Sequence, residues 1–494
     1  MDTLWKDVRF ACRTLLRSPG FTAVAALSMA LGIGANTTIF STVNGLLLRP
    51  APYEDPERIV VLHETQARNH IDHGSVSYLD YRDIGEQCGA FSAVAAHTGR
   101  SLTLGGGDEP ERVAGEAITA SLFPLLGVKP LLGRTFSADE DRPGGPNVVV
   151  LSHELWQRRF HGDPGVLGQA MLVNQAPHTI VGVMPEHFQF PEVQEAWVPL
   201  TPLVATEGRG ERSLDVLARL APGVTMDRGR AEMDAVAARW EKLHPDTHAG
   251  WKAEVRPLRD EMVGKNGRLM ILTLQGAVGF VLLIACANVA NLFLARASGR
   301  RREIAVRSAF GAGRVRIVRQ LLTESVLVAL VGAGLGLILA VWGIRLIIAS
   351  IPQQAHMPFW MSFEIDGKVL LFTVVVAVAT GVLFGLAPAL QAARTDLNAT
   401  LKEGGRGAGG SRRGNRLRHG LVVAEVALSL VLLVGAALFA RSFLGLLAAS
   451  GGFETAHLLT FRVYLPGEAY EPDEPKTRRM DDVIRRLESL PGVQ

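Results

Sequence analysis

The stretch "NLFLARASGRRREIAVRSAFGAGRVRIVRQLLTES", from Asn291 to Ser325, separates two long apolar runs and decides how the chain is organised. It contains eight arginines and only two carboxylates. Arginine and lysine accumulate in loops on the cytoplasmic side of a membrane. The stretch therefore predicts a cytoplasmic loop that joins two membrane-spanning helices.

The composition of the 494-residue chain supports a membrane protein that carries one large water-exposed part. Hydrophobic residues make up 48% of it and charged residues 20%, and the net charge is +3. The three cysteines, Cys12, Cys88 and Cys286, match no metal or redox spacing. We expect membrane lipid, and no nucleic acid, among the partners.

Five apolar stretches are long enough to cross a bilayer core of about 30 Å: 21–48, 269–294, 321–348, 369–390 and 421–447. The first follows four basic residues, as a signal peptide does, but its apolar run is longer than the roughly 7–15 residues of a cleavable signal. We therefore interpret it as an uncleaved anchor. The N-terminal segment, the loop after the second span and the linker after the fourth span are all basic, which makes the N-terminus cytoplasmic.

These observations divide the chain into consecutive segments. Leu4, Val8, Cys12 and Leu15 share one helical face, which predicts an amphipathic helix on the inner leaflet. The division is a cytoplasmic amphipathic helix (1–20), a first span (21–48), an extracytoplasmic domain (49–267), spans two to four (268–392) with a cytoplasmic loop (296–319), a cytoplasmic basic linker (393–418), a fifth span (419–447) and the start of a second extracytoplasmic domain (448–494).

The extracytoplasmic segment 49–267 alternates strand-like and helix-like patterns. The runs "RIVVLHE", "NVVVLS", "HTIVGVM" and "LDVLARL" predict strands, and "RGRAEMDAVAARWEKLHP" predicts a helix. The fold class is therefore an α-helical transmembrane bundle plus a mixed α/β extracytoplasmic domain.

No catalytic constellation is visible in this segment. Two clusters could offer metal ligands: His70, Asp72 and His73, and His244, Asp246 and His248. Neither has the helical geometry of an HExxH site, and Pro245 interrupts the second. We interpret both as exposed loop histidines, and we predict no catalytic residue, no metal and no cofactor bound by this chain.

The pattern of the N-terminal part begins again after residue 418. A basic approach leads into an apolar span, a polar turn and the strand-like "HLLTFRVYLP". We expect the chain to be the N-terminal part of a longer duplicated protein. The alternative is a five-span protein with a small outside tail.

The arginine-rich loop has an internal pattern that topology alone does not require. Glu303 and Arg307 have the stabilising i,i+4 order, and Gly311 follows as a helix terminator. This predicts a short cytoplasmic helix that could transmit force between a partner and the bundle. The alternative is a charged loop that only fixes orientation.

The spans carry two further patterns. In the third span Ala329 and Ala333, and Gly332 and Gly336, have the small-xxx-small spacing of close helix packing. Polar groups such as Asn36 inside a span are hypotheses of function or of bonding between helices.

The loop resembles the R-E-I-x-x-R-x-A-x-G-A signature of the MacB/FtsX-like ABC transporter permeases, the type VII or mechanotransmission class. The matching residues are Arg302, Glu303, Ile304, Arg307, Ala309, Gly311 and Ala312. The segments "GEAITASLFPLLGVKPLLGRTFSADED" and "VVVLSHELWQRRF" resemble the MacB periplasmic core domain. The resemblance is strongest to the duplicated orphan permeases (ADOP), and it covers essentially the whole chain.

The resemblance implies a permease subunit in the bacterial cytoplasmic (inner) membrane that passes the ATP-driven motion of a cytoplasmic ABC ATPase to the outside domain, for export or efflux. Glu303 and Arg307 would orient the coupling helix, and Ala309 to Ala312 would contact the ATPase. The chain contains no GxxxxGK[ST] motif, so it is expected not to be an enzyme, and ATP would be used by the partner subunit.

Other partners implied by the resemblance are a periplasmic adaptor and a second permease unit, or the chain's own second repeat. The alternative function is a non-transport membrane regulator, either an FtsX-like activator of an extracytoplasmic enzyme or a sensor.

Overall fold

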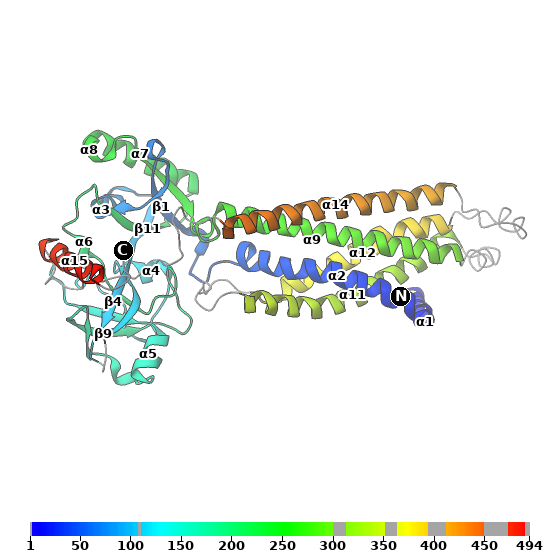
Figure 1. Cartoon of the computed structure of the whole chain (residues 1–494), viewed down its shortest axis with the longest axis horizontal. Helices are drawn as coiled ribbons and strands as arrows, with labels where there is room; N and C mark the ends of the chain where they lie inside the picture. Colours follow the sequence, from blue (N-terminus) through cyan, green and yellow to red (C-terminus); the bar gives the residue numbers. More distant parts are fainter. Residues whose placement is uncertain are drawn as a thin grey trace, which may run out of the picture. The chain divides into compact units, whose positions relative to one another are not determined.

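The computed structural model describes residues 2–106, 110–299, 313–350, 363–393, 412–448 and 473–489. The chain forms two compact units, which are described separately (Figure 1). The helical unit comprises Met1–Arg49, Lys265–Ala355 and Met361–Leu458. The sheet unit comprises Pro50–Gly264, His356–Trp360 and Leu459–Gln494.

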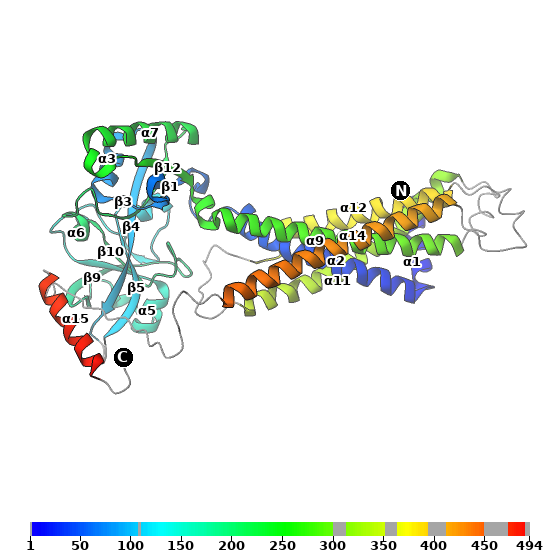
Figure 2. The same cartoon turned by 45° about the horizontal axis from the view of Figure 1, so that its top comes forward.

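Half of the sheet unit is a split β-α-β arrangement. Its strands lie in the order β12-β1-β11-β4, and neighbouring strands are antiparallel. The helices α3 and α7 connect β1 to β4 and β11 to β12, and both lie on the same side of these strands (Figure 2). The elements are β1 (Ile59–Gln66), α3 (Tyr78–Gln87), β4 (Phe91–Leu104), β11 (Arg212–Leu220), α7 (Met226–Leu243) and β12 (Lys252–Pro257).

The chain between β4 and β11 extends the same sheet. Its strand order continues as β4-β5-β10-β7-β9-β6, in which the β5–β10 and β7–β9 pairs are parallel. The strands are β5 (Glu111–Ile118), β6 (Leu132–Gly133), β7 (Val148–Leu151), β8 (Ala170–Val173), β9 (Ala176–Val183) and β10 (Ala196–Pro199). Short elements complete the unit: β2 (Ile71–Gly74), β3 (Val76–Ser77), α4 (Leu122–Leu126), α5 (His153–Phe160), α6 (Thr201–Val204) and α8 (Pro245–His248). A separate helix, α15, covers Asp473–Glu488.

Both faces of the sheet are buried. Along β1, Val60 and Leu62 point into the core beneath α3 and α7, whereas Ile59 and Val61 point into the opposite core with Phe123 of α4. Successive side chains of a strand point to opposite faces, so a strand covered on both faces reads as a continuous apolar run. This explains the runs of valine and leucine in the sequence, and the mixed α/β prediction is confirmed.

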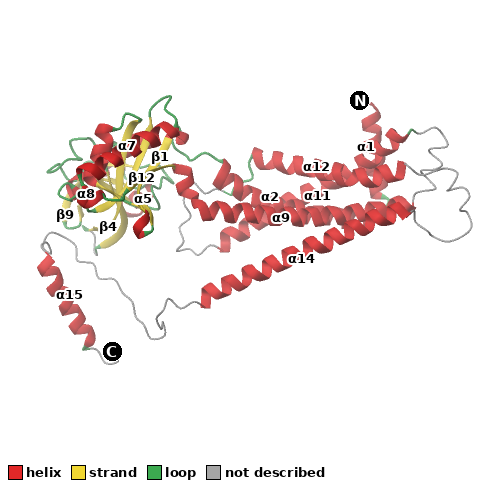
Figure 3. Cartoon of the chain, turned by 90° about the horizontal axis from the view of Figure 1, so that it is seen from above, coloured by secondary structure: helices red, strands yellow, loops and turns green. Residues whose placement is uncertain are grey.

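The helical unit contains five helices long and apolar enough to cross a membrane, within the part of the chain that is described. They follow the short helix α1 (Asp2–Leu16) and are α2 (Pro19–Val43, continued by a π-helical turn, Asn44–Leu48), α9 (Leu258–Gly299), α11 (Arg314–Ser350), α12 (Gly367–Ala393) and α14 (Arg412–Ala448). The helices α2, α9, α11 and α12 run side by side (Figures 1 and 3). The predicted transmembrane bundle is thus present.

The helix α9 is interrupted at Gly264, where φ is 67° and ψ is 157°. This combination is accessible essentially only to glycine. The interruption separates the acidic first turns of α9, with Asp260 and Glu261, from its apolar part, which extends from Asn266 to Arg296.

The buried face of α1 agrees with the predicted one at Leu15 and differs from it at Val8 and Cys12. Cys12 is exposed and Val8 only half-buried, whereas Asp7, Ala11, Thr14 and Leu15 are buried. The hydropathy pattern missed this face because two of its members, Asp7 and Thr14, are polar. Arginines from other helices bond the carboxylate of Asp7 and the backbone carbonyl of Thr14.

Candidate functional site

The residues assigned to the coupling helix, Arg302, Glu303, Ile304, Arg307, Ala309, Gly311 and Ala312, lie outside the described residues. The structure does describe the two ends of the loop 296–319. Arg296 lies in the last turn of α9, and Arg319 lies in the second turn of α11. The contacts of these two arginines define what holds the loop to the bundle.

Arg296 binds the end of α1. Its NH2 donates to the hydroxyl of Ser18 over 2.6 Å and to the carbonyl of Thr14 over 3.1 Å. Its guanidinium carbon lies 4.3 Å from the centre of the Phe21 ring. The last carbonyls of a helix lack intrahelical partners and carry partial negative charge, so a cation is favourable at this position.

Arg319 binds the same helix about two turns closer to its beginning. Its Nε donates to Oδ2 of Asp7 over 2.6 Å. The Asp7 side chain is only 12% exposed, which makes this pair stronger than a solvent-exposed one. Arg296 and Arg319 therefore attach both ends of the loop 296–319 to α1.

The packing of α11 against α2 and α12 depends on small residues. A Cβ added at Gly332 would lie 2.5 Å from Cβ of Met29, and one at Gly336 would lie 3.0 Å from the nitrogen of Gly34. On the α12 side a Cβ at Gly381 would lie 3.3 Å from Cβ of Ala329. The predicted small-residue spacing in this span is confirmed as a close helix contact.

Polar side chains connect α2 with the other helices. Nδ2 of Asn36 donates to the carbonyl of Val278 in α9 over 2.7 Å, and Thr37 and Thr373 of α12 are hydrogen-bonded at 3.0 Å. Asn44 donates to Asp366 over 2.8 Å. The polar groups of the first span thus serve helix–helix bonding.

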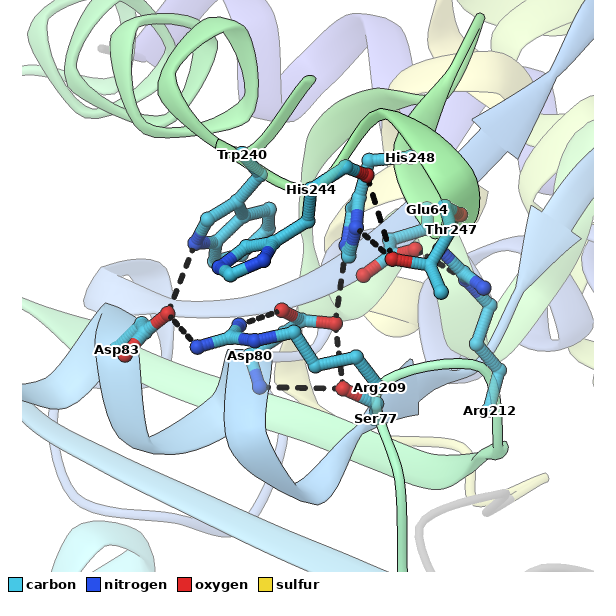
Figure 4. Close-up of polar contacts among 10 residues, drawn as sticks. All are labelled: Glu64, Ser77, Asp80, Asp83, Arg209, Arg212, Trp240, His244, Thr247 and His248. Atoms are coloured by element: carbon cyan, nitrogen blue, oxygen red, sulfur yellow. Dashed lines mark hydrogen bonds and ion pairs between the residues drawn. The ribbon is translucent and has the colours of Figure 1, made fainter. Parts of the chain in front are cut away.

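The sheet unit contains a buried polar cluster between α3, β1, β11 and α8 (Figure 4). Asp80 of α3 is bonded by Ser77, by Arg209 and by Nε2 of His248 at 3.1 Å. Glu64 of β1 pairs with Arg212 of β11.

The interpretation of the second histidine cluster as an exposed loop is wrong for His248. This side chain is 2% exposed, because it closes the polar cluster from α8, whereas Asp246 is exposed. Sequence proximity grouped His244 with His248, but the partner of His248 is Asp80, far away along the chain. In the first cluster His70, Asp72 and His73 are exposed, as interpreted from the sequence, but Asp72 and His73 lie in strand β2 and not in a loop.

One hydroxyl of the cluster is bonded to the imidazole. Oγ1 of Thr247 lies 2.9 Å from Nδ1 of His248, and Nε2 of the same ring bonds Asp80, so a hydroxyl, an imidazole and a carboxylate are connected in series (Figure 4). Ser77 bonds the carboxylate and not the imidazole. Ser77 is instead the N-cap of α3, since its hydroxyl accepts from the backbone N–H of Asp80 over 3.1 Å.

The pKa values of the two carboxylates in the cluster, Glu64 and Asp80, are shifted in opposite directions. Burial raises the pKa of Glu64 above its ordinary value, and the nearby Arg212 offsets this only in part. Burial also opposes ionisation of Asp80, but the bonds from His248 and Ser77 and the charges of His248 and Arg209 outweigh it and lower the pKa. The site therefore favours the ionised form of Asp80, whereas it disfavours ionisation of Glu64 although Arg212 pairs with it.

Asp7, Ala11, Thr14 and Leu15 share one side of a helix, but two of them are polar, so hydropathy does not single out this face of α1 in the sequence. The contacts of Arg296 and Arg319 with α1 had no signal in the sequence either.

Two family models match the chain. The MacB-like periplasmic core domain matches residues 22–236, and the FtsX-like permease C-terminal domain matches residues 276–397.

Relatives include the probable export ATP-binding/permease protein MacB of Pseudomonas entomophila, 30% identical over 285 residues that cover 56% of this chain and 40% of that protein. The macrolide export ATP-binding/permease protein MacB of Burkholderia pseudomallei is 28% identical over 308 residues that cover 60% and 44%. The chain spans less than half the length of these curated relatives.

The crystal structure of the periplasmic region of MacB from Actinobacillus actinomycetemcomitans is similar to 45% of this chain and 95% of its own, at 15% identity and a TM-score of 0.34. The two matched domains and the five candidate spans support a bacterial inner-membrane protein of a permease family. With the core domain followed by the FtsX-like domain, this chain belongs to the MacB/FtsX-like permeases.

Proposed function

We propose that this chain is the permease subunit of an ABC-type export system and that it transmits the motion of a separate cytoplasmic ATPase to its extracytoplasmic sheet unit. The observation that carries the proposal is the attachment of both ends of the loop 296–319 to α1, through Arg296 and Arg319. A force applied to this loop would act on α9, α11 and α1 together, rather than on one flexible connection.

The helix α9 is the proposed route of transmission. Its apolar part, Asn266–Arg296, has 31 residues. At 1.5 Å per residue this is a rod about 46 Å long, longer than a bilayer core of about 30 Å. Gln275 and Val278 bond it to Asn36, so α2 would accompany its movement.

ATP hydrolysis is proposed to occur on another chain. The relatives carry names of the form ATP-binding/permease protein, whereas the present sequence contains no GxxxxGK[ST] motif that would hold ATP phosphates. Among the relatives, one is named for macrolide export and another for syringafactin export, so export is proposed as the class of activity without a specific cargo.

The proposed orientation places α1 and the loop 296–319 in the cytoplasm. Lys129 is exposed in the sheet unit and Arg316 is exposed near the loop. In a background with Cys12 replaced by serine, Lys129→Cys should react with an impermeant thiol reagent on intact cells. Arg316→Cys should react only after the cells are opened, and the reverse pattern would reject the orientation.

A second permease unit is a proposed partner of α14. In the most apolar part of Arg418–Gly445, 0% of the residues are buried within the described structure. An apolar helix of this kind would pack either on lipid or on another helix, and a paired permease unit would supply the latter.

The proposal is tested by purifying the protein from its own membrane and identifying an ABC ATPase that accompanies it. Ala309→Trp keeps every charge of the loop but adds bulk to the proposed contact, and overpacking of about 1–3 kcal/mol should weaken ATPase binding by about tenfold or more. The control, Arg300→Lys with Arg301→Lys, should bind as wild type does. Equal binding of the ATPase by wild type and Ala309→Trp would leave the loop as a topology signal only.

A further inference from the structure

Three side chains that commonly bind metals converge at one edge of the sheet unit: His63 of β1, His73 of β2 and Glu261 of the first turn of α9. Nε2 of His63 lies 3.2 Å from Oε2 of Glu261, and Nδ1 of His73 lies 3.8 Å from Oε1 of the same carboxylate. All three ligand atoms lie within 4.8 Å of one another.

These distances are close to those of a transition-metal site. Zinc binds imidazole nitrogen and carboxylate oxygen at about 2.0–2.2 Å, so tetrahedral ligand atoms lie about 3.3 Å apart. Two histidines and one glutamate with a further open position are a recurrent zinc ligand set. His73 lies on β2, which pairs with β1, the strand of His63.

The innermost of the three side chains faces the carboxylate directly. The His63 side chain is only 9% exposed, and its Nε2 lies 3.2 Å from the buried Oε2 of Glu261, with no other hydrogen-bond partner for either atom among the described residues. An imidazole N–H can donate to the carboxylate at this distance, so a bound cation would replace one hydrogen bond between the two groups.

The access of solvent to the ligand atoms distinguishes His63, His73 and Glu261 from the buried cluster of Glu64, Asp80 and His248. His73 is 48% exposed, so an ion can enter from solvent. In the other group Glu64, Asp80 and His248 are fully enclosed, and arginines already neutralise both carboxylates. A cation is therefore favoured at the first group and not at the second.

Arg256 is a positive group that opposes a cation here. Its NH1 lies 3.0 Å from Nε2 of His73 and 3.9 Å from Oε2 of Glu261. The same guanidinium is held by Glu254, with Nε 2.7 Å from Oε1. Arg256 can therefore keep a carboxylate partner when His73 turns toward a metal.

We propose that His63, His73 and Glu261 bind a divalent transition metal of the zinc class, with one position left for water or an external ligand. The bound ion would fasten the β1–β2 edge to the first turn of α9, just before the interruption at Gly264. The proposal stands on these side chains alone and does not depend on the permease function.

The test is equilibrium dialysis of the full chain in detergent against buffered Zn²⁺, followed by metal quantification. Wild type should retain one more equivalent than His63→Gln, His73→Gln or Glu261→Gln, and each replacement should weaken that binding by at least about tenfold. His70→Ala removes an exposed histidine close by in sequence and should retain zinc as wild type does. Mg²⁺ should not be retained, because it prefers oxygen ligands.

A further variant separates a metal site from a network of ion pairs. Arg256→Gln removes the competing charge, and it should bind Zn²⁺ more tightly than wild type while its thermal stability without metal changes little or falls. Retention of the same amount of zinc by wild type and by all three ligand variants, or of none by wild type, would overturn the proposal. Folding of the variants is checked by their circular dichroism without metal.

Discussion

The carboxylate of Asp7 accepts a hydrogen bond of 2.6 Å from Nε of Arg319, which joins the first helix of the chain to a residue 312 positions later. Together with the bonds from Arg296 to Ser18 and Thr14, this contact connects α1 to both ends of the arginine-rich loop. An amphipathic helix that only lay on lipid would not require a buried carboxylate at Asp7.

Charge reversal tests the contact between Asp7 and Arg319. Asp7→Arg or Arg319→Asp should each release α1, at a loss of about 1–3 kcal/mol, because one charged partner loses its hydrogen bond. The combination of both changes should restore the pair with its charges exchanged. Limited proteolysis near residue 18 would measure the release, and the double variant should be as resistant as wild type.

A matched control for this series is Arg316→Asp. It lies on the same helix, makes the same change in charge and is exposed. Release of α1 in Arg316→Asp to the same extent as in Arg319→Asp would mean that general charge, and not the Asp7 contact, holds the helix.

Close packing of α11 on α2 predicts a strong effect of one methyl group. In Gly332→Ala the new Cβ would approach Cβ of Met29 to 2.5 Å and the carbonyl of Ala26 to 3.2 Å. The two helices would have to separate, at about 1–3 kcal/mol. In Gly334→Ala the Cβ meets nothing within 4 Å, so this variant should be as stable as wild type or more stable. Thermal unfolding in one detergent compares them, and equal loss in both variants would contradict the packing.

Asp80 of the buried cluster predicts an acid-sensitive contribution to the stability of the sheet unit. Because the folded-state pKa of Asp80 lies below its ordinary value of 3.8, its contribution is complete above about pH 4 and is lost as the pH falls toward the folded-state pKa. Asp80→Asn should cost about 3 kcal/mol at pH 7, the lower end for a broken buried pair, since Arg209 keeps Asp83 at 2.7 Å. It should also remove this part of the acid dependence.

Pulse proteolysis at a series of urea concentrations and pH values would measure that profile. Asp234→Asn replaces an exposed aspartate on α7 and serves as the control, with an unchanged profile. If Asp80→Asn loses stability in acid as steeply as wild type, then other carboxylates determine the acid sensitivity.

Short patterns in the sequence predicted many of the strands and helices. The runs "RIVVLHE" and "LDVLARL" contain most of β1 and β11, and the helix predicted from Arg228 onward, in "RGRAEMDAVAARWEKLHP", is α7. Hydropathy also located the apolar helices, since a span must be apolar along its whole length. These elements were predictable because each is determined by residues that are close together in the chain.

The remaining features depend on contacts between residues that are distant in sequence. The strand order β12-β1-β11-β4 joins the two ends of the sheet unit, and no local pattern encodes that pairing. The burial of Asp7 and His248 was not predictable either, because a polar side chain becomes a buried one only when its partner, Arg319 or Asp80, is brought to it by the fold.

The central claim is that motion at the loop 296–319 reaches the extracytoplasmic sheet unit, and hydrogen exchange measures this most directly. The permease would be purified with its ATPase and compared with and without ATP under conditions that block hydrolysis. We predict that ATP changes the exchange of backbone amides in the first turns of α9, around Glu261, in wild type and in the Asp7→Arg/Arg319→Asp double variant. The change should be absent in Ala309→Trp and in either single charge reversal. Identical exchange in the sheet unit with and without ATP, in a wild-type complex that binds ATP, would contradict the account.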